Sequence, residues 1–263
     1  MPLLVLRFDL RNPAFAGVTL TDRYAAALEM CEWADTNGVL AVVLSEHHGS
    51  EDGYLPSALT MAAAVAARTS NVAIWVSAVA APFHDPVRLA EEAVVVDSIS
   101  AGRLTLVLAN GYVPSEFDMF GVPIGERVAR TTEAVLAVRA ARDGAPVQVG
   151  ERSVKVTPAP DRRNGRTGPT VLLGGSGPAA ARRAARIADG FQPSNPEAWE
   201  VYRSARIDAG HADPGGYLAE PTGFTHVSLD PDAAWERIAH HALPEPQSYG
   251  RWAIEAGIEG ASG

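Results

Sequence analysis

The amino-acid sequence predicts an α/β fold in which parallel strands alternate with helices. Continuous apolar runs of strand length, such as Val39–Leu44, are typical of parallel strands that are buried on both faces. Each run is followed by a segment with helical periodicity and recognisable end signals. Because every strand–helix–strand crossover must be right-handed, repeated units of this kind favour a (β/α)8 barrel or an open doubly wound sheet.

The first half of the chain contains four strand–helix units. Leu3–Leu10 is the first strand, and Thr21 is expected to cap a helix that ends at Asn37-Gly38. The next three units have predicted strands at Val39–Leu44, Val72–Ala81 and Arg103–Ala109, and predicted helices at Pro56–Thr69, Pro86–Ser100 and Gly125–Asp143.

The alternation breaks after the fourth unit, at an insertion over about residues 144–169. Pro146–Val149 and Ser153–Thr157 alternate around Gly150-Glu151, which predicts a β-hairpin, and a Pro/Arg/Gly-rich connection follows. Further strands are predicted at Thr170–Leu173, around Phe191 and at Thr222–Leu229, with helices at Gly177–Asp189, Glu197–Ala209 and from Pro231 onward. Residues 1–263 therefore form one barrel domain of seven units, in which the eighth is missing or truncated.

Composition excludes several classes of protein. The 31 acidic and 22 basic residues give a net charge of −9, which disfavours binding to nucleic acid or to an anionic membrane. The longest apolar run, Val72–Phe83, is too short for a membrane helix, and Arg7 and Asp9 interrupt any signal sequence at the N-terminus. Because Cys31 is the only cysteine, no internal disulfide can form. We expect a soluble, cytoplasmic protein.

Polar residues follow the Val39–Leu44 strand, as Ser45-Glu46-His47-His48-Gly49. Imidazole at the mouth of a barrel can accept a proton near neutral pH, which makes His47 the candidate catalytic residue. Adjacent histidines on extended backbone point to opposite sides, so we expect only one of them to face the cavity. Paired metal ligands are usually spaced differently, and no metal site is predicted. Structural packing of both histidines is the alternative interpretation.

Three other segments place small or amide residues at strand ends. Leu172–Pro178 includes Gly174, Gly175 and Ser176 and leads into a helix, a pattern typical of an anion site, although an ordinary capped turn explains it equally well. The second segment, Asn110 with Gly111, combines an amide with close backbone approach. In the third, the small residues Ser77 and Ala78 leave room for a flat ligand within an apolar strand, and small core packing is the alternative.

Five segments in one register resemble the bacterial luciferase-like flavin-dependent monooxygenase family. They are Leu44–Gly49, Ser77-Ala78 with Pro82–Glu91, Asp97–Leu104, Gly111–Phe117, and Gly174–Ser176 with Ala188–Gly190. The resemblance implies a TIM barrel with an insertion, and reduced flavin bound at the carboxyl ends of the strands. It also implies that His47 acts as a base or stabilises the peroxyflavin, that Ser77-Ala78 is a cis peptide under the flavin ring, and that Gly175 and Ser176 hold its phosphate.

The resemblance further implies that Asn110 contacts the flavin, where luciferase itself carries arginine. The leading hypothesis is a monooxygenase in which reduced FMN and O2 form a C4a-peroxyflavin that oxidises a small organic substrate. No dinucleotide fingerprint is present, so a separate flavin reductase is expected to supply the cofactor. A homodimer is the habit of the family. The alternatives are hydride transfer with the deazaflavin coenzyme F-420, a non-catalytic flavin-binding barrel and a metal-dependent hydrolase.

Overall fold

A computed structural model of the protein describes residues 4–160, 168–218 and 224–258. Six parallel strands form one sheet in the order β1-β2-β3-β4-β7-β8. Each strand pairs with the next one along the chain, except that the hairpin strands β5 and β6 come between β4 and β7. The strands are β1 (Val5–Phe8), β2 (Ala41–Leu44), β3 (Ala73–Ala80), β4 (Leu104–Ala109), β7 (Thr170–Gly175) and β8 (Gly190–Pro193). The sheet confirms the predicted α/β class with parallel strands.

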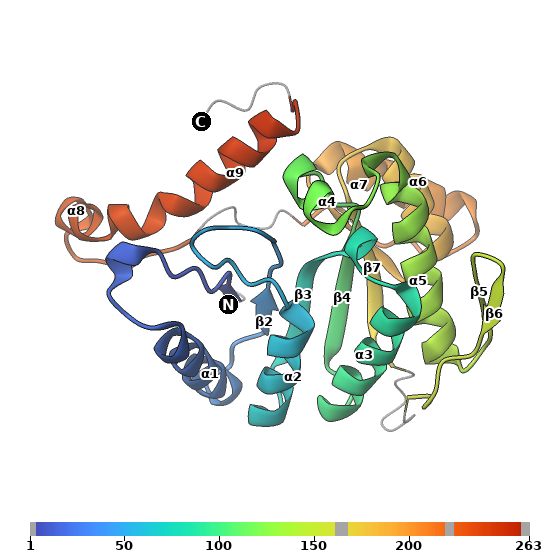
Figure 1. The fold of residues 1–263 in the computed structure, drawn as a ribbon, viewed down its shortest axis with the longest axis horizontal. Coiled ribbons are helices and arrows are strands. Elements are labelled where there is room, and N and C mark those ends of the chain that lie inside the picture. The colour runs from blue at the N-terminus through green and yellow to red at the C-terminus, as the bar shows by residue number, and fades with distance from the viewer. Residues whose placement is uncertain (1–3, 161–167, 219–223, 259–263) are drawn as a thin grey trace.

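The helices that follow the strands cover one face of the sheet (Figure 1). These helices are α1 (Leu20–Thr36), α2 (Ala58–Arg68), α3 (Pro86–Ile99), α5 (Arg127–Asp143), α6 (Pro178–Ile187) and α7 (Pro196–Asp208). The α1 N-cap is Thr19 rather than the predicted Thr21, because the side chain of Thr19 accepts from the backbone N–H of Asp22 and Asp22 bonds back, a capping box. No described helix is both long and apolar enough to cross a membrane.

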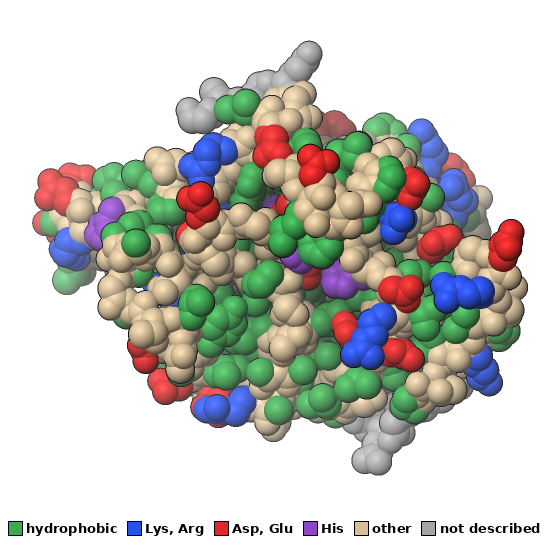
Figure 2. All heavy atoms as spheres, in the orientation of Figure 1, with side chains coloured by type: hydrophobic (Ala, Val, Ile, Leu, Met, Phe, Trp, Pro, Cys, Tyr) green, Lys and Arg blue, Asp and Glu red, His purple; other side chains and the backbone are tan. Residues whose placement is uncertain are grey.

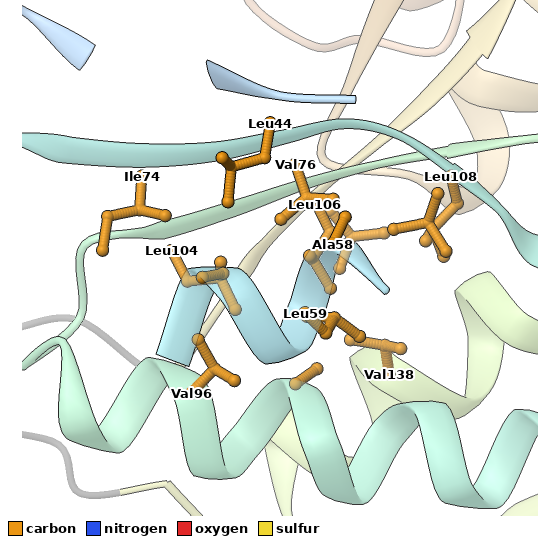
Figure 3. Packing of buried hydrophobic residues seen from close by; sticks show 14 of the residues in the cluster. Leu44, Ala58, Leu59, Ile74, Val76, Val96, Leu104, Leu106, Leu108 and Val138 are labelled. Atoms are coloured by element: carbon orange, nitrogen blue, oxygen red, sulfur yellow. The ribbon is translucent and has the colours of Figure 1, made fainter. Parts of the chain in front are cut away.

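The hydrophobic core lies between the sheet and these helices. Ile74 and Val76 on β3, together with Leu106 on β4, point toward α2 and α3 and are fully buried (Figure 3). Side chains two apart on a strand share a face, so this spacing places one apolar row of each strand in the core. The opposite face carries polar residues: Arg7 on β1 donates from Nε to Oγ of Ser45 just after β2, at 3.2 Å.

The insertion is confirmed as a two-stranded antiparallel hairpin. It consists of β5 (Val147–Val149) and β6 (Arg152–Val154), and it follows α5 as predicted. A further short helix, α4 (Pro114–Phe120), follows β4 and was not predicted. The Pro-rich connection at 161–167 lies outside the described residues.

The predicted seventh strand is wrong over the described residues 224–229, which carry no strand; residues 222–223 lie outside the described part. The segment has the apolar and β-branched residues of a strand, yet Val227 and Leu229 are 90% and 108% exposed. Alternation is insufficient without a neighbouring strand to supply hydrogen bonds. Within the described chain, β1 and β8 each pair on one side only, and no pairing joins them to each other.

The helix expected from Pro231 onward is two helices. These are α8 (Pro231–Ala242) and α9 (Pro244–Glu255), and Leu243 joins them. Leu243 keeps helical dihedral angles, but Pro244 has no N–H to continue the hydrogen bonds of α8 and its ring crowds the preceding turn, which explains the break. α9 crosses above the carboxyl end of β2 (Figure 1).

Candidate active site

The predicted site residues lie along one edge of the sheet. The carboxyl ends of parallel strands share an edge, and the strand order places β2, β3, β4 and β7 side by side. The site residues are distributed over these four strands in the same sequence: His47 follows β2, Ser77 and Ala78 lie in β3, Asn110 and Gly111 follow β4, and Gly174, Gly175 and Ser176 end β7.

His47 is held by a buried carboxylate. Its Nδ1 lies 2.8 Å from Oε1 of Glu116, whose side chain is 3% exposed. The same Oε1 accepts the backbone N–H of His48, also at 2.8 Å. Because a carboxylate only accepts, His47 donates from Nδ1, and Nε2 is left as its basic nitrogen. Glu116 thus fixes both the orientation and the proton position of the imidazole.

Four aromatic side chains surround the His47 ring. The Trp252 indole is stacked on it, with ring centroids 4.1 Å apart and planes at 24°. The rings of Tyr54, Tyr249 and Tyr112 meet it at steep angles, with centroids 5.0, 5.5 and 6.1 Å away. Trp252 and Tyr249 come from α9, which closes over His47 although it is nearly 200 residues away in the sequence. This wall keeps the imidazole 11% exposed.

His48 faces a different environment, as expected for adjacent histidines. Its Nε2 lies 3.3 Å from Oε1 of Glu46, a fully buried carboxylate that also receives Nε2 of His84 at 3.2 Å and the backbone N–H of Ala80 at 3.1 Å. Burial by itself would raise the pKa of Glu46, but the hydrogen bonds from the two histidines lower it to about 2. This cluster anchors the loop after β2 to the end of β3. Histidine side chains reach the surface beneath α4 (Figure 2).

The peptide bond between Ser77 and Ala78 is cis, as the resemblance implies. It coincides with a shift in register, because Ser77 pairs with Val107 and Val79 pairs with Leu108, leaving Ala78 without a counterpart on β4. The irregularity interrupts the ladder at the centre of the site edge, where a flat ligand would lie against the sheet.

Asn110 presents an unused acceptor at the same edge. Its Oδ1 is buried and has no hydrogen-bond partner within the described part of the chain. Next to it, Gly111 has a φ of +65°, and a Cβ there would meet the Phe117 ring at 3.3 Å. Glycine is therefore required by the turn and by this packing. Buried amide oxygens are rarely left unpaired, so Oδ1 of Asn110 is available to accept from an N–H or O–H donor.

The glycine loop after β7 leads directly into α6. A Cβ at Gly174 would lie 3.2 Å from Cγ1 of Val107, and one at Gly175 would lie 2.6 Å from Cβ of Ala180. Packing against β4 and α6 thus explains both glycines without a ligand. Ser176 is exposed, and among the described residues no side chain caps the first N–H groups of α6, so these donors are available to an anion.

These features fit a flavin nucleotide. His47 and the glycine loop are separated by three strand spacings, about 14 Å at 4.8 Å each. The cis peptide of Ser77 and the orphaned Asn110 oxygen lie between them, where a ring system would contact the sheet, and the open end of α6 suits a phosphate. By contrast, no group of three or more metal-ligating side chains occurs among the described residues.

Sequence reasoning missed three elements of the site. Glu116 lies within the recognised Gly111–Phe117 segment, but one sequence cannot say that its side chain turns toward His47. Tyr249 and Trp252 carry no local signal, because only the path of α9 brings them to β2. A test for acidic residues in predicted strand-end loops would have found Glu116 as a candidate.

The chain resembles several known proteins. It is 32% identical over 108 residues to 4-hydroxyprotoasukamycin monooxygenase from Streptomyces nodosus subsp. asukaensis, covering 41% of this chain and 29% of that protein. It is 35% identical over 95 residues to the oxygenase component of a flavin-dependent trigonelline monooxygenase from Acinetobacter baylyi, covering 36% of this chain and 26% of that protein. The matched region is therefore less than a third of either relative.

Two further comparisons cover more of the chain. A coenzyme F-420-dependent glucose-6-phosphate dehydrogenase from Nakamurella multipartita is 28% identical, over 67% of this chain and 54% of that protein. The crystal structure of the monooxygenase RslO1 from Streptomyces bottropensis superposes with a TM-score of 0.76 at 26% identity, over 97% of this chain and 83% of that one. The model of the family described as luciferase-like monooxygenase matches residues 6–261. The chain belongs to the luciferase-like monooxygenase family.

Proposed function

We propose that this protein is a flavin-dependent monooxygenase that uses reduced FMN and O2 to oxidise a small organic substrate. The observation that carries the proposal is the His47–Glu116 pair, 2.8 Å apart at the sheet edge that also holds the orphaned Asn110 oxygen. When bound, reduced FMN supplies the electrons with which one oxygen atom of O2 enters the substrate and the other leaves as water.

The protein contributes binding, orientation and proton control. Asn110 would accept a hydrogen bond from the flavin ring, Ser77 and Ala78 would support its face, and Gly174, Gly175 and Ser176 would position its phosphate at the start of α6. His47 would receive or return a proton at Nε2 while its Nδ1 stays bonded to Glu116. The aromatic wall would exclude water from this step.

Replacement of His47 by alanine tests the proposal. We expect His47→Ala to bind reduced FMN with the affinity of the wild type but to turn over at least about a hundredfold more slowly, as expected for loss of a general acid–base. His48→Ala is the matched control, because His48 lies next in the chain and bonds Glu46 instead. Unchanged turnover in His47→Ala would disprove the assigned role.

A second candidate is hydride transfer with coenzyme F-420, which the similarity to the dehydrogenase from Nakamurella multipartita favours. Titration of both reduced cofactors, followed by fluorescence quenching, separates the two. Binding of F-420 without binding of FMN would favour hydride transfer over monooxygenation. A non-catalytic flavin-binding barrel is a third candidate, motivated by the open sheet between β1 and β8. Flavin binding without oxygen-dependent substrate consumption would favour it.

Partners follow from the proposed chemistry. The trigonelline monooxygenase relative is described as an oxygenase component. By analogy, we propose that a separate reductase supplies reduced FMN to this protein and that two copies associate as a homodimer. Oxygen-dependent turnover that requires an added NADH:flavin reductase, and sedimentation of the purified chain, test these two points.

A further inference from the structure

Helix α9 lies across the candidate site as a strap held by polar contacts. Glu245 pairs with Arg7 at 3.1 Å, the Ser248 hydroxyl accepts from Arg11 at 3.0 Å, and Glu255 accepts the backbone N–H of Ser115 at 2.7 Å. Ser248 is the only α9 residue that is fully buried, so the helix adds little to the hydrophobic core. Its side chains are concentrated instead on the sheet edge around His47.

Two α9 side chains, Trp252 and Tyr249, place an aromatic ring and a phenolic hydroxyl next to His47. The Trp252 indole covers a face of the His47 ring with the geometry of a stacked pair. The Tyr249 hydroxyl accepts from Nη2 of Arg7 at 3.2 Å and lies 3.0 Å from the hydroxyl of Tyr54. A planar ring and a phenolic oxygen are thus already accommodated beside the candidate base.

The charges around these positions favour an electron-rich ring over a cationic one. The Arg11 guanidinium carbon lies 4.6 Å from the Tyr54 ring centroid and 5.4 Å from that of Trp252. Arg11, whose charge is paired with Asp9 and Asp52, already supplies a cation to these aromatic faces, so an electron-rich ring there gains the same cation as a neighbour. A cavity of about 410 Å³ is lined in part by Arg7, Arg11 and Glu245, and its lining does not include Tyr249 or Trp252.

We propose that the substrate is a hydroxylated aromatic compound that displaces Trp252 and Tyr249, so that its ring stacks on His47 and its hydroxyl bonds to Arg7 and Tyr54. This inference rests on the proposed function and extends it to the substrate class. Trp252 is then a specificity-determining residue, because it occupies the site until a ring of the right shape replaces it. If a substrate must first displace α9, its apparent affinity equals its affinity for the open site multiplied by the fraction of molecules in which the site is open.

Removal of the indole gives a direct test in the protein without flavin. We expect Trp252→Ala to bind phenol, measured by titration calorimetry, at least tenfold more tightly than the wild type does. Glu255→Gln, which loosens α9 at Ser115 and leaves the His47 surroundings intact, should raise phenol affinity about threefold. Trp235→Ala on α8 is the matched control, because Trp235 is 48% exposed and should leave phenol affinity unchanged.

The choice of probes separates shape from hydrophobicity. In Trp252→Ala, toluene lacks the hydroxyl and cyclohexanol lacks the planar ring, so each should bind at least about threefold more weakly than phenol. Equal affinity for phenol and cyclohexanol, or phenol affinities in Trp252→Ala and Glu255→Gln that match the wild type, would overturn the inference. Titration of the same proteins with reduced FMN reports on the proposed function separately, because phenol binding needs no flavin.

Discussion

The pair formed by His47 and Glu116 yields a prediction whose size follows from the structure. In Glu116→Gln, the amide oxygen can take the place of Oε1 and accept from both Nδ1 of His47 and the N–H of His48, each at 2.8 Å. The geometry is then retained and only the charge is lost. A hydrogen bond to a charged group contributes about 1.5–3 kcal/mol, against about 1 kcal/mol for a neutral one.

The difference is about 1–1.5 kcal/mol for the bond to His47, which corresponds to roughly a tenfold loss in turnover. Both bonds contribute to folding, so the free energy of unfolding should fall by about 2–3 kcal/mol. In Glu116→Ala, two buried donors lose their acceptor, and we expect a loss of about 2–6 kcal/mol. The assays are steady-state turnover and urea denaturation.

Glu126→Gln serves as the control, because Glu126 forms an exposed pair with Arg130 four residues along α5. Its free energy of unfolding should change by less than about 0.5 kcal/mol, and its turnover should not change. Wild-type turnover in Glu116→Gln would refute the idea that the carboxylate charge assists His47. A fall in the free energy of unfolding of Glu116→Gln by more than about 3 kcal/mol would show that the geometry had not been retained.

Three other substitutions test interactions that stabilise the fold outside the His47–Glu116 pair. Because the pKa of Glu46 is lowered from 4.5 to about 2, its carboxylate stabilises the fold by about 3 kcal/mol above pH 4.5, and this contribution is lost as the pH falls toward 2. The difference in free energy of unfolding between the wild type and Glu46→Gln should therefore shrink as the pH falls from 4.5 toward 2. A difference that stays constant over this range would contradict the prediction. Leu106→Ala removes a fully buried side chain between β4 and the helices and should cost about 2–5 kcal/mol in urea denaturation. Arg103→Met should cost about 3 kcal/mol, because the Arg103 guanidinium donates to Val72 O and to both oxygens of Thr69 at 2.8–2.9 Å; a loss below about 0.5 kcal/mol would show that water replaces these bonds.

The β/α alternation was predictable because its signals are local. Buried strands such as β2 are unbroken apolar runs, and the hairpin of β5 and β6 is visible from its turn. Segment 224–229 shows where such signals fail. It contains strand-forming residues, but a strand also needs a partner edge, and only the arrangement of the whole chain decides whether one is within reach.

The site was predictable to the same degree. Polar residues after parallel strands must meet at one edge, so His47, Asn110 and the glycine loop could be grouped from their positions. Glu116 could not be assigned, because α4 lacks the length for a clear periodic pattern and the direction of one side chain is not encoded locally.

The sequence by itself determined the α/β class and the strand ends at which the candidate residues, His47 among them, would lie. These properties follow from side-chain alternation and from the shared direction of parallel strands. Only the tertiary structure decided what surrounds that imidazole: a buried carboxylate from α4 and an aromatic wall from α9. Glu116 lies 69 positions from His47 in the sequence, and Trp252 lies 205 positions from it. Contacts over such separations depend on how the helices pack, which the whole molecule decides and no single segment does.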